Sequence, residues 1–367
     1  MDNTQKKISE RNWWNSIDKY ILIPALLLMI FGIISISSIS QHLSYKSYFS
    51  SNILFKKHLI FCLLSILIIF FISQLSLKNL IYISLLIFVV SIILSLGTIF
   101  LFSETKGANR WIKIFNFSFQ PSELLKPSFI VLSAVLLGRY KLKNDFSIFL
   151  NIIFFSLVSV VLILQPDFGM FVLIFCAWLT QICSSSIKMK IILPIILGFL
   201  LIFILCFLTL DHVKFRIMNF LFSEVGDNYQ IKMSLNSFES GGLFGKGIGE
   251  GLVAKGLPDV HSDFIFALIG EELGGIFAIF VIIMYLILYT RAHLISQRSN
   301  NFFIITSLTG LANILIFQVI INISSALNII PTKGMTLPFI SYGGSSFIST
   351  SIIIGFILLL VKEHKNG

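Results

Sequence analysis

Long apolar runs separated by short polar gaps make up most of the chain from Ile21 to Val361. A helix that crosses a membrane needs about 20 mostly apolar residues, and these runs have that length. The pattern therefore predicts an all-α integral membrane protein, a bundle of about ten transmembrane helices. The ten predicted spans are residues 21–40, 58–73, 79–102, 122–138, 148–165, 168–186, 190–210, 264–289, 302–329 and 338–361.

Composition supports a membrane protein, because 56% of the residues are hydrophobic and only 12% are charged. The formal charge of +10 comes from basic residues in short gaps between apolar runs, with no basic tail, so it does not indicate nucleic-acid binding. The first span follows a basic stretch but lacks a small-residue cleavage site, so we interpret it as a retained anchor.

Lysine and arginine in the loops predict the orientation, because cytoplasmic loops carry an excess of both. With the N-terminus inside, the inner segments hold fourteen of these residues and the short outer loops hold seven. Both termini are then cytoplasmic. The predicted organisation is a cytoplasmic segment (1–20), a ten-span membrane domain (21–361) with a long extracytoplasmic loop (211–263) between spans seven and eight, and a cytoplasmic tail (362–367).

The polar motifs fall on the outer side in this orientation. GANRW (107–111) and FQPSELLK (119–126) lead into span four, and QPD (165–167) turns between spans five and six. The long loop ends at Asp263, and PTKGMTLPFISYGG (331–344) joins spans nine and ten. The inner loops hold little besides Lys, Arg, Ser and Asn. The working face of the protein is therefore predicted to be the outer one.

Span nine carries a polar stripe, because Gln318, Asn322 and Ser325 follow one another at spacings of four and three. Such a stripe either bonds to a neighbouring helix or lines a polar cavity, and the sequence leaves both open. Span ten begins with Pro338 and is rich in Gly and Ser, which permits close approach to a helix or to a ligand.

Motifs of soluble enzymes and metal sites fail on inspection. SGGLFGKG (240–247) lacks the first Gly and the final Ser or Thr of a phosphate-binding loop, and GEGLVA (249–254) has no preceding strand. The four cysteines and six histidines show no paired or metal-ligand spacing. We predict no cofactor and no protein-bound metal, and the sequence leaves divalent-cation dependence open.

The outer motifs, taken in order with SGGLFGKGIGEG, LPDVHSDFIFALIGEELG and IPTKGMTLPFISYGGSS, resemble the successive signatures of the SEDS family of bacterial cell-wall proteins. The resemblance covers roughly residues 20–360 and is nearer to the division branch than to the elongation branch. Ser262, where Thr is usual, and Pro127 depart from the pattern without removing a charge.

The resemblance implies a peptidoglycan glycosyltransferase that polymerises lipid II, a polyprenyl-pyrophosphate-linked disaccharide pentapeptide, at the outer face of the bacterial cytoplasmic (inner) membrane. It places the catalytic general base at Asp263, whose alternative role is a carboxylate at a helix start. The expected substrate-binding residues are Arg110, Glu123, Lys126, His261, Gln318, Asn322, Lys333 and Ser341. Arg110, Lys126 and Lys333 are the expected pyrophosphate contacts, with ion pairs to Glu123 or Glu271, or snorkelling to head groups, as the alternative.

Glu271 and Glu272 stand inside the apolar run that follows Asp263. On one continuous helix Glu271 would lie about 12 Å deeper than Asp263, where a carboxylate is costly unless it is protonated or paired. We therefore expect structural or substrate-groove roles, with at least one glutamate paired to a cation such as Lys126.

The resemblance further implies a complex with a class B penicillin-binding protein, a single-span transpeptidase, and with other division proteins at the septum. Two alternative functions are a lipid II flippase, which needs polar groups through the inner half of the bundle, and a non-catalytic division scaffold, which tolerates loss of Asp263.

Overall fold

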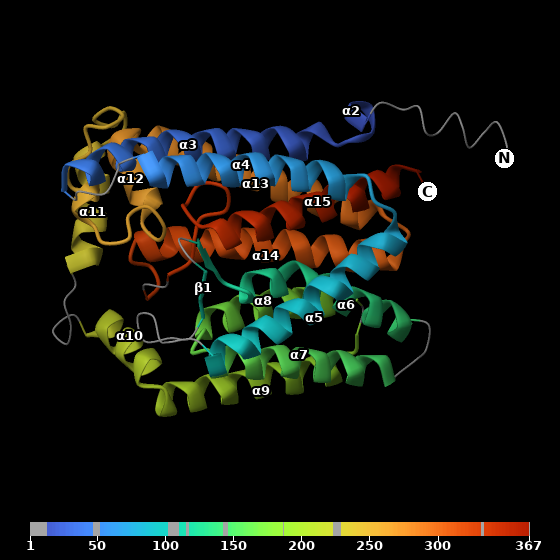
Figure 1. The fold of residues 1–367 in the computed structure, drawn as a ribbon. Coiled ribbons are helices and arrows are strands. Elements are labelled where there is room, and N and C mark those ends of the chain that lie inside the picture. The colour runs from blue at the N-terminus through green and yellow to red at the C-terminus, as the bar shows by residue number, and fades with distance from the viewer. Residues whose placement is uncertain are drawn as a thin grey trace.

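The computed structural model describes residues 13–46, 52–101, 110–114, 117–141, 146–185, 187–222, 229–331 and 334–366. These residues are almost entirely helical (Figure 1). The helices are α2 (Trp13–Ser16), α3 (Lys19–Lys46), α4 (Asn52–Ser73), α5 (Leu77–Leu101), α6 (Ser122–Lys141), α7 (Phe146–Leu164), α8 (Phe168–Ser184), α9 (Met189–Thr209), α10 (Asp211–Leu221), α11 (Tyr229–Gly241), η1 (Ala254–Gly256), α12 (Ile265–Glu272), α13 (Gly274–Arg298), α14 (Phe302–Ala326) and α15 (Gly344–Asn366). Strands β1 (Ile112–Ile114) and β2 (Phe117–Phe119) form one small antiparallel hairpin.

The all-α membrane fold is confirmed. Eight of the described helices are long and apolar enough to cross a membrane, namely α3, α4, α5, α7, α9, α13, α14 and α15. Helix α8 is apolar but has only 17 residues, and α6 has 20 residues with charged side chains near both ends. In the part of the chain that the structure describes, ten helices therefore have 17 residues or more.

Two expected spans differ from the observed helices, and the expected long loop is partly helical. The expected span 264–289 is two helices, because Leu273 ends α12 and Gly274 turns the chain with a φ of 84°, which a residue with a side chain rarely adopts. The expected span 338–361 becomes helical only at Gly344, after a turn at Leu337–Tyr342. The segment 211–263, expected as one loop, contains α10, α11 and η1.

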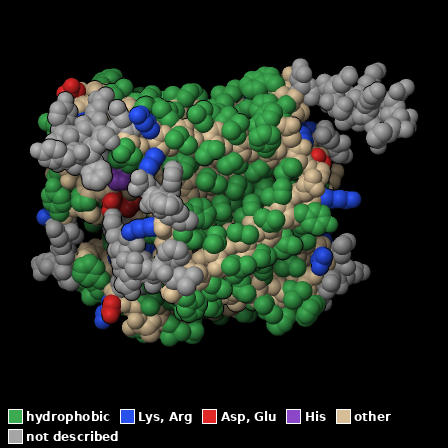
Figure 2. Space-filling model, in the orientation of Figure 1, with side chains coloured by type: hydrophobic (Ala, Val, Ile, Leu, Met, Phe, Trp, Pro, Cys, Tyr) green, Lys and Arg blue, Asp and Glu red, His purple; other side chains and the backbone are tan. Residues whose placement is uncertain are grey.

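Helices α14 and α15 form the centre of the bundle, because 78% and 89% of an 18-residue apolar stretch in each is buried, whereas the same fraction for α9 at the edge is only 11%. Helix α15 can approach α4 closely because a Cβ at Gly344 or Gly355 would collide with Phe61 or Ile72. On the face seen in Figure 2, hydrophobic side chains cover most of the surface between two ends that carry the charged side chains, as expected for a protein that faces lipid.

The two ends of the bundle differ in what they carry. Helix α2 and the last turn of α15 lie at one end, as expected for termini on one side (Figure 1). The hairpin and α10, α11 and α12 lie toward the other end. Following the orientation predicted from the loop charges, we name the first the inner end and the second the outer end.

A buried carboxylate joins three helices at the inner end. Asp18, only 2% exposed, accepts three hydrogen bonds of 2.8–3.2 Å from the Arg291 guanidinium and one of 3.1 Å from Lys365 Nζ. These contacts connect the start of α3 to the ends of α13 and α15. Burial opposes ionisation of Asp18, but the hydrogen bonds from both cations hold the pKa of this carboxyl below its usual value.

We expect Asp18→Asn to lower the unfolding free energy of the detergent-solubilised protein by about 1–3 kcal/mol, less than for a fully buried pair because both cations are partly exposed. The folded-state pKa of Asp18 is lowered, so this stabilisation is present at neutral pH and is lost as the pH falls through that lowered value. Thermal unfolding measures the loss. Glu363→Gln, at the same end, is the control, and equal melting temperatures for both variants would contradict the role of Asp18.

Candidate active site

Asp263 lies in a turn at the outer end, immediately before α12. Its backbone N–H donates to the carbonyl of Asp259 at 3.0 Å, and its own carbonyl accepts from the Asn322 amide on α14 at 3.1 Å. The carboxylate lies against Gly334, where an added Cβ would be 3.1 Å from Asp263 Oδ2. The backbone of this turn is therefore held from two sides, and its side chain faces a residue that has none.

Residues 334–342, which we name the outer loop, are tied directly to the Asp263 turn. The Ser341 hydroxyl donates to the carbonyl of Ser262 at 2.5 Å and accepts from the N–H of Leu337 at 2.8 Å. The Tyr342 N–H donates to the carbonyl of His261 at 2.7 Å, and the His261 and Tyr342 rings lie 5.7 Å apart. Two of the expected site residues, Ser341 and His261, thus lie beside Asp263.

The polar stripe on α14 binds this loop. The Asn322 amide donates to the carbonyl of Met335 at 2.6 Å as well as to that of Asp263, and the Gln318 amide donates to the carbonyl of Thr336 at 2.9 Å. Of the two alternatives left open by the sequence, the structure favours bonding to neighbouring segments. Gln318 and Asn322 position the outer loop against the Asp263 turn.

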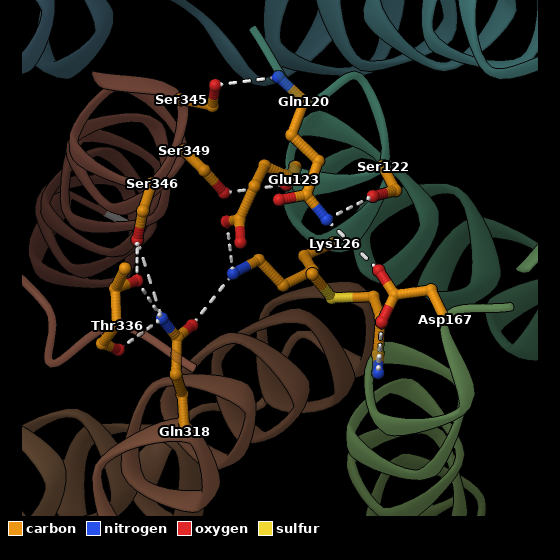
Figure 3. A network of polar contacts seen from close by, with 11 residues as sticks. Gln120, Ser122, Glu123, Lys126, Asp167, Gln318, Thr336, Ser345, Ser346 and Ser349 are labelled. Carbon is orange, nitrogen blue, oxygen red and sulfur yellow. Dashed lines mark hydrogen bonds and ion pairs between the residues drawn. The ribbon is translucent and has the colours of Figure 1, made fainter. Parts of the chain in front are cut away.

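Lys126 lies at the centre of a buried polar network (Figure 3). Its side chain is almost fully buried, and Nζ is 2.5 Å from Glu123 Oε2 and 2.7 Å from Gln318 Oε1. The Glu123 carbonyl accepts from Ser349 at 2.7 Å, which joins α6 to α15. Lys126 therefore forms the ion pair with Glu123 that was the alternative to phosphate contact, and it connects α6 to the loop-binding Gln318.

Arg110 binds the turn between α7 and α8. Its guanidinium donates to the carbonyls of Gln165 and Pro166 and lies 3.4 Å from the carboxylate of Asp167. Asp167 also accepts from the Gln120 amide at 3.0 Å (Figure 3), so this turn is linked to the start of α6. The Arg110 side chain is 20% exposed, so part of it faces the outside.

Glu271 holds the segment 246–255 against the end of α12. Its two carboxylate oxygens accept from the backbone N–H groups of residues 252, 253 and 254 at 2.6–3.1 Å, and Lys246 Nζ lies 3.4 Å away. Burial alone would raise the pKa of Glu271, but the N–H groups of Ala254 and Val253 and the Lys246 cation lower it below its usual value. Glu271 is therefore a buried acceptor that organises a loop.

Glu272 makes a different set of contacts from the same helix end. Its carboxylate accepts from the Ser38 hydroxyl on α3 at 2.5 Å and lies 3.5 Å from Lys255 Nζ. Both glutamates thus make structural contacts, one of the two roles expected for them, and each binds different partners. The expectation that at least one glutamate pairs with a cation is confirmed, because Glu271 lies beside Lys246 and Glu272 beside Lys255. Lys126, the example given, pairs with Glu123 instead.

The expected site residues form two connected groups. Asp263, His261, Ser341 and Asn322 lie around the outer loop, and Lys126 and Glu123 lie behind it, joined to it through Gln318. Arg110, which precedes β1, binds the α7–α8 turn and does not contact either group directly. Lys333 lies outside the described residues.

Sequence reasoning missed three contributors. Gln120 binds Asp167, and the Thr336 carbonyl accepts from Gln318. Both partners are distant in sequence, so no local pattern predicts these contacts. Arg216 on α10 lies within electrostatic range of Arg110, Asp167 and Asp263. The amphipathic spacing around Arg216 in DHVKFRIMNFL was the available signal.

The described residues hold no group of three or more His, Cys, Asp or Glu side chains arranged to bind a metal ion. The expectation that the protein itself holds no cofactor and no metal stays a prediction. The described arrangement offers a carboxylate at the outer end, on a turn whose backbone is held in place by hydrogen bonds.

Comparison with known proteins gives consistent matches over the whole chain. Residues 18–366 match the FtsW, RodA and SpoVE family model, described as a cell cycle protein. The chain is 30% identical to a probable peptidoglycan glycosyltransferase FtsW of Caulobacter vibrioides, covering 97% of this chain and 92% of the relative. It is 33% identical to the protein of that name from Coxiella burnetii, covering 99% and 100%.

Two solved structures share the fold. One is a chain from a structure described as "Structural coordination of polymerization and crosslinking by a peptidoglycan synthase complex". It superposes with a TM-score of 0.78 at 21% sequence identity, and the match covers 96% of this chain and 99% of that one. The other is the rod shape determining protein RodA of Thermus thermophilus, with a TM-score of 0.70, 22% identity, and coverage of 96% and 98%. At these identities the likeness is one of fold.

We expect Glu271→Gln to speed hydrogen exchange at the N–H groups of residues 252–254 by about tenfold or more, because a hydrogen bond to a charged acceptor contributes about 1.5–3 kcal/mol and glutamine turns an N–H₂ group toward them. Glu272→Gln is the matched control and should leave these amides protected. In the wild type the same protection should disappear only when the pH falls below the lowered pKa of Glu271. Unchanged exchange in Glu271→Gln would contradict the role of this carboxylate.

Proposed function

Because the chain belongs to the FtsW, RodA and SpoVE family of cell cycle proteins, we propose that it is a peptidoglycan glycosyltransferase of the bacterial cytoplasmic membrane. Its substrate is lipid II, and its product is a glycan strand made at the outer face during cell division. The name shared by the FtsW relatives supports this activity. The observation that carries it is the position of Asp263, a carboxylate held by its backbone at the outer end of a lipid-facing bundle.

In the proposed reaction Asp263 acts as the general base. Its carboxylate takes the proton from the acceptor sugar hydroxyl while that oxygen attacks the anomeric carbon of the donor. The bond from that carbon to the pyrophosphate breaks, and the polyprenyl pyrophosphate leaves with the bonding electrons. A base must reach its proton at hydrogen-bond distance, and the bonds from Asn322 and Ser341 fix the turn on which Asp263 sits.

The other expected site residues take different roles in this proposal. His261, Ser341, Asn322 and Gln318 shape the acceptor side by holding the outer loop, and Glu123 with Lys126 supports that loop from within the bundle. Arg110 and Lys333 are the proposed pyrophosphate contacts among them, because an arginine fork and a lysine ammonium both bind phosphate oxygens.

The inner half of the bundle fits a polymerase better than a flippase. A flippase needs polar groups that line a path through the bundle. The buried Asn151 amide instead donates to the carbonyl and hydroxyl oxygens of Ser133 at 2.9 and 3.0 Å and accepts from the Trp178 indole N–H at 2.6 Å. The Gln181 amide likewise donates to the carbonyls of Ile130 and Thr306. These contacts use both amides to join helices.

The proposed partner is a class B penicillin-binding protein, which would crosslink the strands as they are made, and the proposed place is the division septum together with other division proteins. The likeness to a chain of a peptidoglycan synthase complex supports a partner of this kind. Co-purification in detergent tests it. We expect polymerisation to increase when the partner is added, and full activity without any partner would count against the complex.

We expect Asp263→Asn to reduce polymerisation of purified lipid II by about a hundredfold or more, the usual effect of losing a general base. Asparagine keeps the size and hydrogen bonding of the side chain but cannot take the proton. Asp259→Asn is the matched control, because Asp259 (φ 55°) serves the same turn through its carbonyl and asparagine tolerates that backbone conformation. A polymerisation rate near wild type for Asp263→Asn would rule out this residue as the base.

A further inference from the structure

The outer loop, which lies between α14 and α15 in the chain, reaches into the interior of the bundle. The Pro338 carbonyl, near the middle of this loop, accepts a hydrogen bond of 2.5 Å from the buried hydroxyl of Tyr285 on α13. Tyr285 lies eleven residues after Gly274, where α13 begins, so the contact is about 16 Å along α13 from its outer end. The outer loop is therefore irregular backbone held well inside the bundle.

Side chains of two helices supply the donors that this backbone needs. Irregular backbone is tolerated at membrane depth only where protein or water satisfies its polar groups. On α14 the Gln318 amide binds the Thr336 carbonyl (Figure 3), and the Asn322 amide binds a second loop carbonyl. Because proline has no N–H, the carbonyl is the only hydrogen-bonding group of Pro338. Tyr285 binds that group and so ties the loop to α13 as well as to α14.

The residue after Pro338 carries backbone strain. Phe339 has a φ of 62°, a conformation that bulky residues rarely adopt. Strained backbone persists only where its surroundings hold it. The Phe339 ring is buried 5.7 Å from the Phe347 ring on α15, and its carbonyl lies where an added Cβ at Gly32 would collide with it. The carbonyl that Tyr285 binds belongs to the peptide group joining Pro338 to Phe339, so this bond restrains the strained dihedral directly.

The outer loop contacts the Asp263 turn on both sides of this anchor. Before Pro338, Gly334 faces the carboxylate, and an added Cβ there would be 3.1 Å from Asp263 Oδ2. After Pro338, Ser341 and Tyr342 donate to carbonyls of the Asp263 turn at 2.5 and 2.7 Å. A rotation of the strained peptide group would therefore move both contacting segments relative to Asp263.

We propose that Tyr285 is a positioning residue for the general base. Its bond to Pro338 fixes the outer loop, and the outer loop fixes the place of the Asp263 carboxylate. The inference rests on the proposed function and adds to it a residue that does not touch the substrate. A displacement of about 1 Å at a reacting group can reduce a rate by about a hundredfold. A hydroxyl in the interior of the bundle thereby affects the reaction without contacting a reacting atom.

The test compares Tyr285→Phe with Tyr289→Phe, which removes the same hydroxyl from the next turn of α13, where the ring stacks on His293. We expect Tyr285→Phe to lower the kcat of lipid II polymerisation by about tenfold or more and to change KM by less than about twofold, because the base is displaced while the substrate contacts remain. Tyr289→Phe should stay near wild type. Equal kcat values for the two variants would overturn the proposal.

A double-mutant cycle tests whether Tyr285 acts through Asp263. In the Asp263→Asn background, Tyr285→Phe should lower kcat by less than about twofold, because the side chain that it displaces no longer takes the proton. A merely structural role for Tyr285 would give the same loss in both backgrounds. A further tenfold loss in the Asp263→Asn background would therefore overturn the positioning role.

Hydrogen exchange tests the anchor without turnover. Tyr285→Phe should speed exchange of the Tyr342 N–H, which binds the Asp263 turn, by about tenfold or more. Ser133→Ala, which removes a buried hydroxyl bonded to Asn151 between α6 and α7, controls for a general loss of stability and should leave this amide protected. Unchanged exchange in Tyr285→Phe would overturn the anchor. If exchange rises as expected but wild type does not polymerise lipid II, the proposed function fails and the anchor stands.

Discussion

Lipid offers no hydrogen-bond partner, so a polar group inside this bundle is costly unless it finds a partner within the protein. Helix α14 is central and largely buried, yet it carries Gln318 and Asn322. Their amides bind the carbonyls of the outer loop and of the Asp263 turn, backbone groups that also need partners near the membrane. The amide donors of α14 thus help to set the position of the Asp263 turn.

The same requirement explains the two adjacent glutamates. Glu271 and Glu272 end α12 just before Gly274 turns the chain, and carboxylates there would be costly without donors. The segment 246–255 supplies them as three backbone N–H groups and two lysines. A loop that looks unstructured in sequence is thereby fixed to the bundle. The break at Gly274 is part of this arrangement, because it places both carboxylates at a helix end where a loop can reach them.

The spans were predictable because the thickness of the bilayer sets their length and composition, and the expected ranges lie near the observed helices. The break between α12 and α13 was not predictable from hydropathy, because apolar residues lie on both sides of Gly274. Ion pairs were likewise predictable within one helix and unpredictable between segments far apart in sequence. Glu123 and Lys126, three residues apart on one helix, were paired correctly as an alternative, but Lys246 with Glu271 depends on a loop returning over 25 residues. Sequence gives faces of helices, and only the fold gives partners between them.

The cations at the outer end differ in the groups that neutralise their charge. Lys126, Lys246 and Lys255 each lie beside a glutamate, so their charge is used in holding helices and loops together. Arg110 shares its charge with Asp167 and two carbonyls. A site that binds a pyrophosphate needs positive charge left over after folding, because a cation already paired must give up its partner before it gains a phosphate.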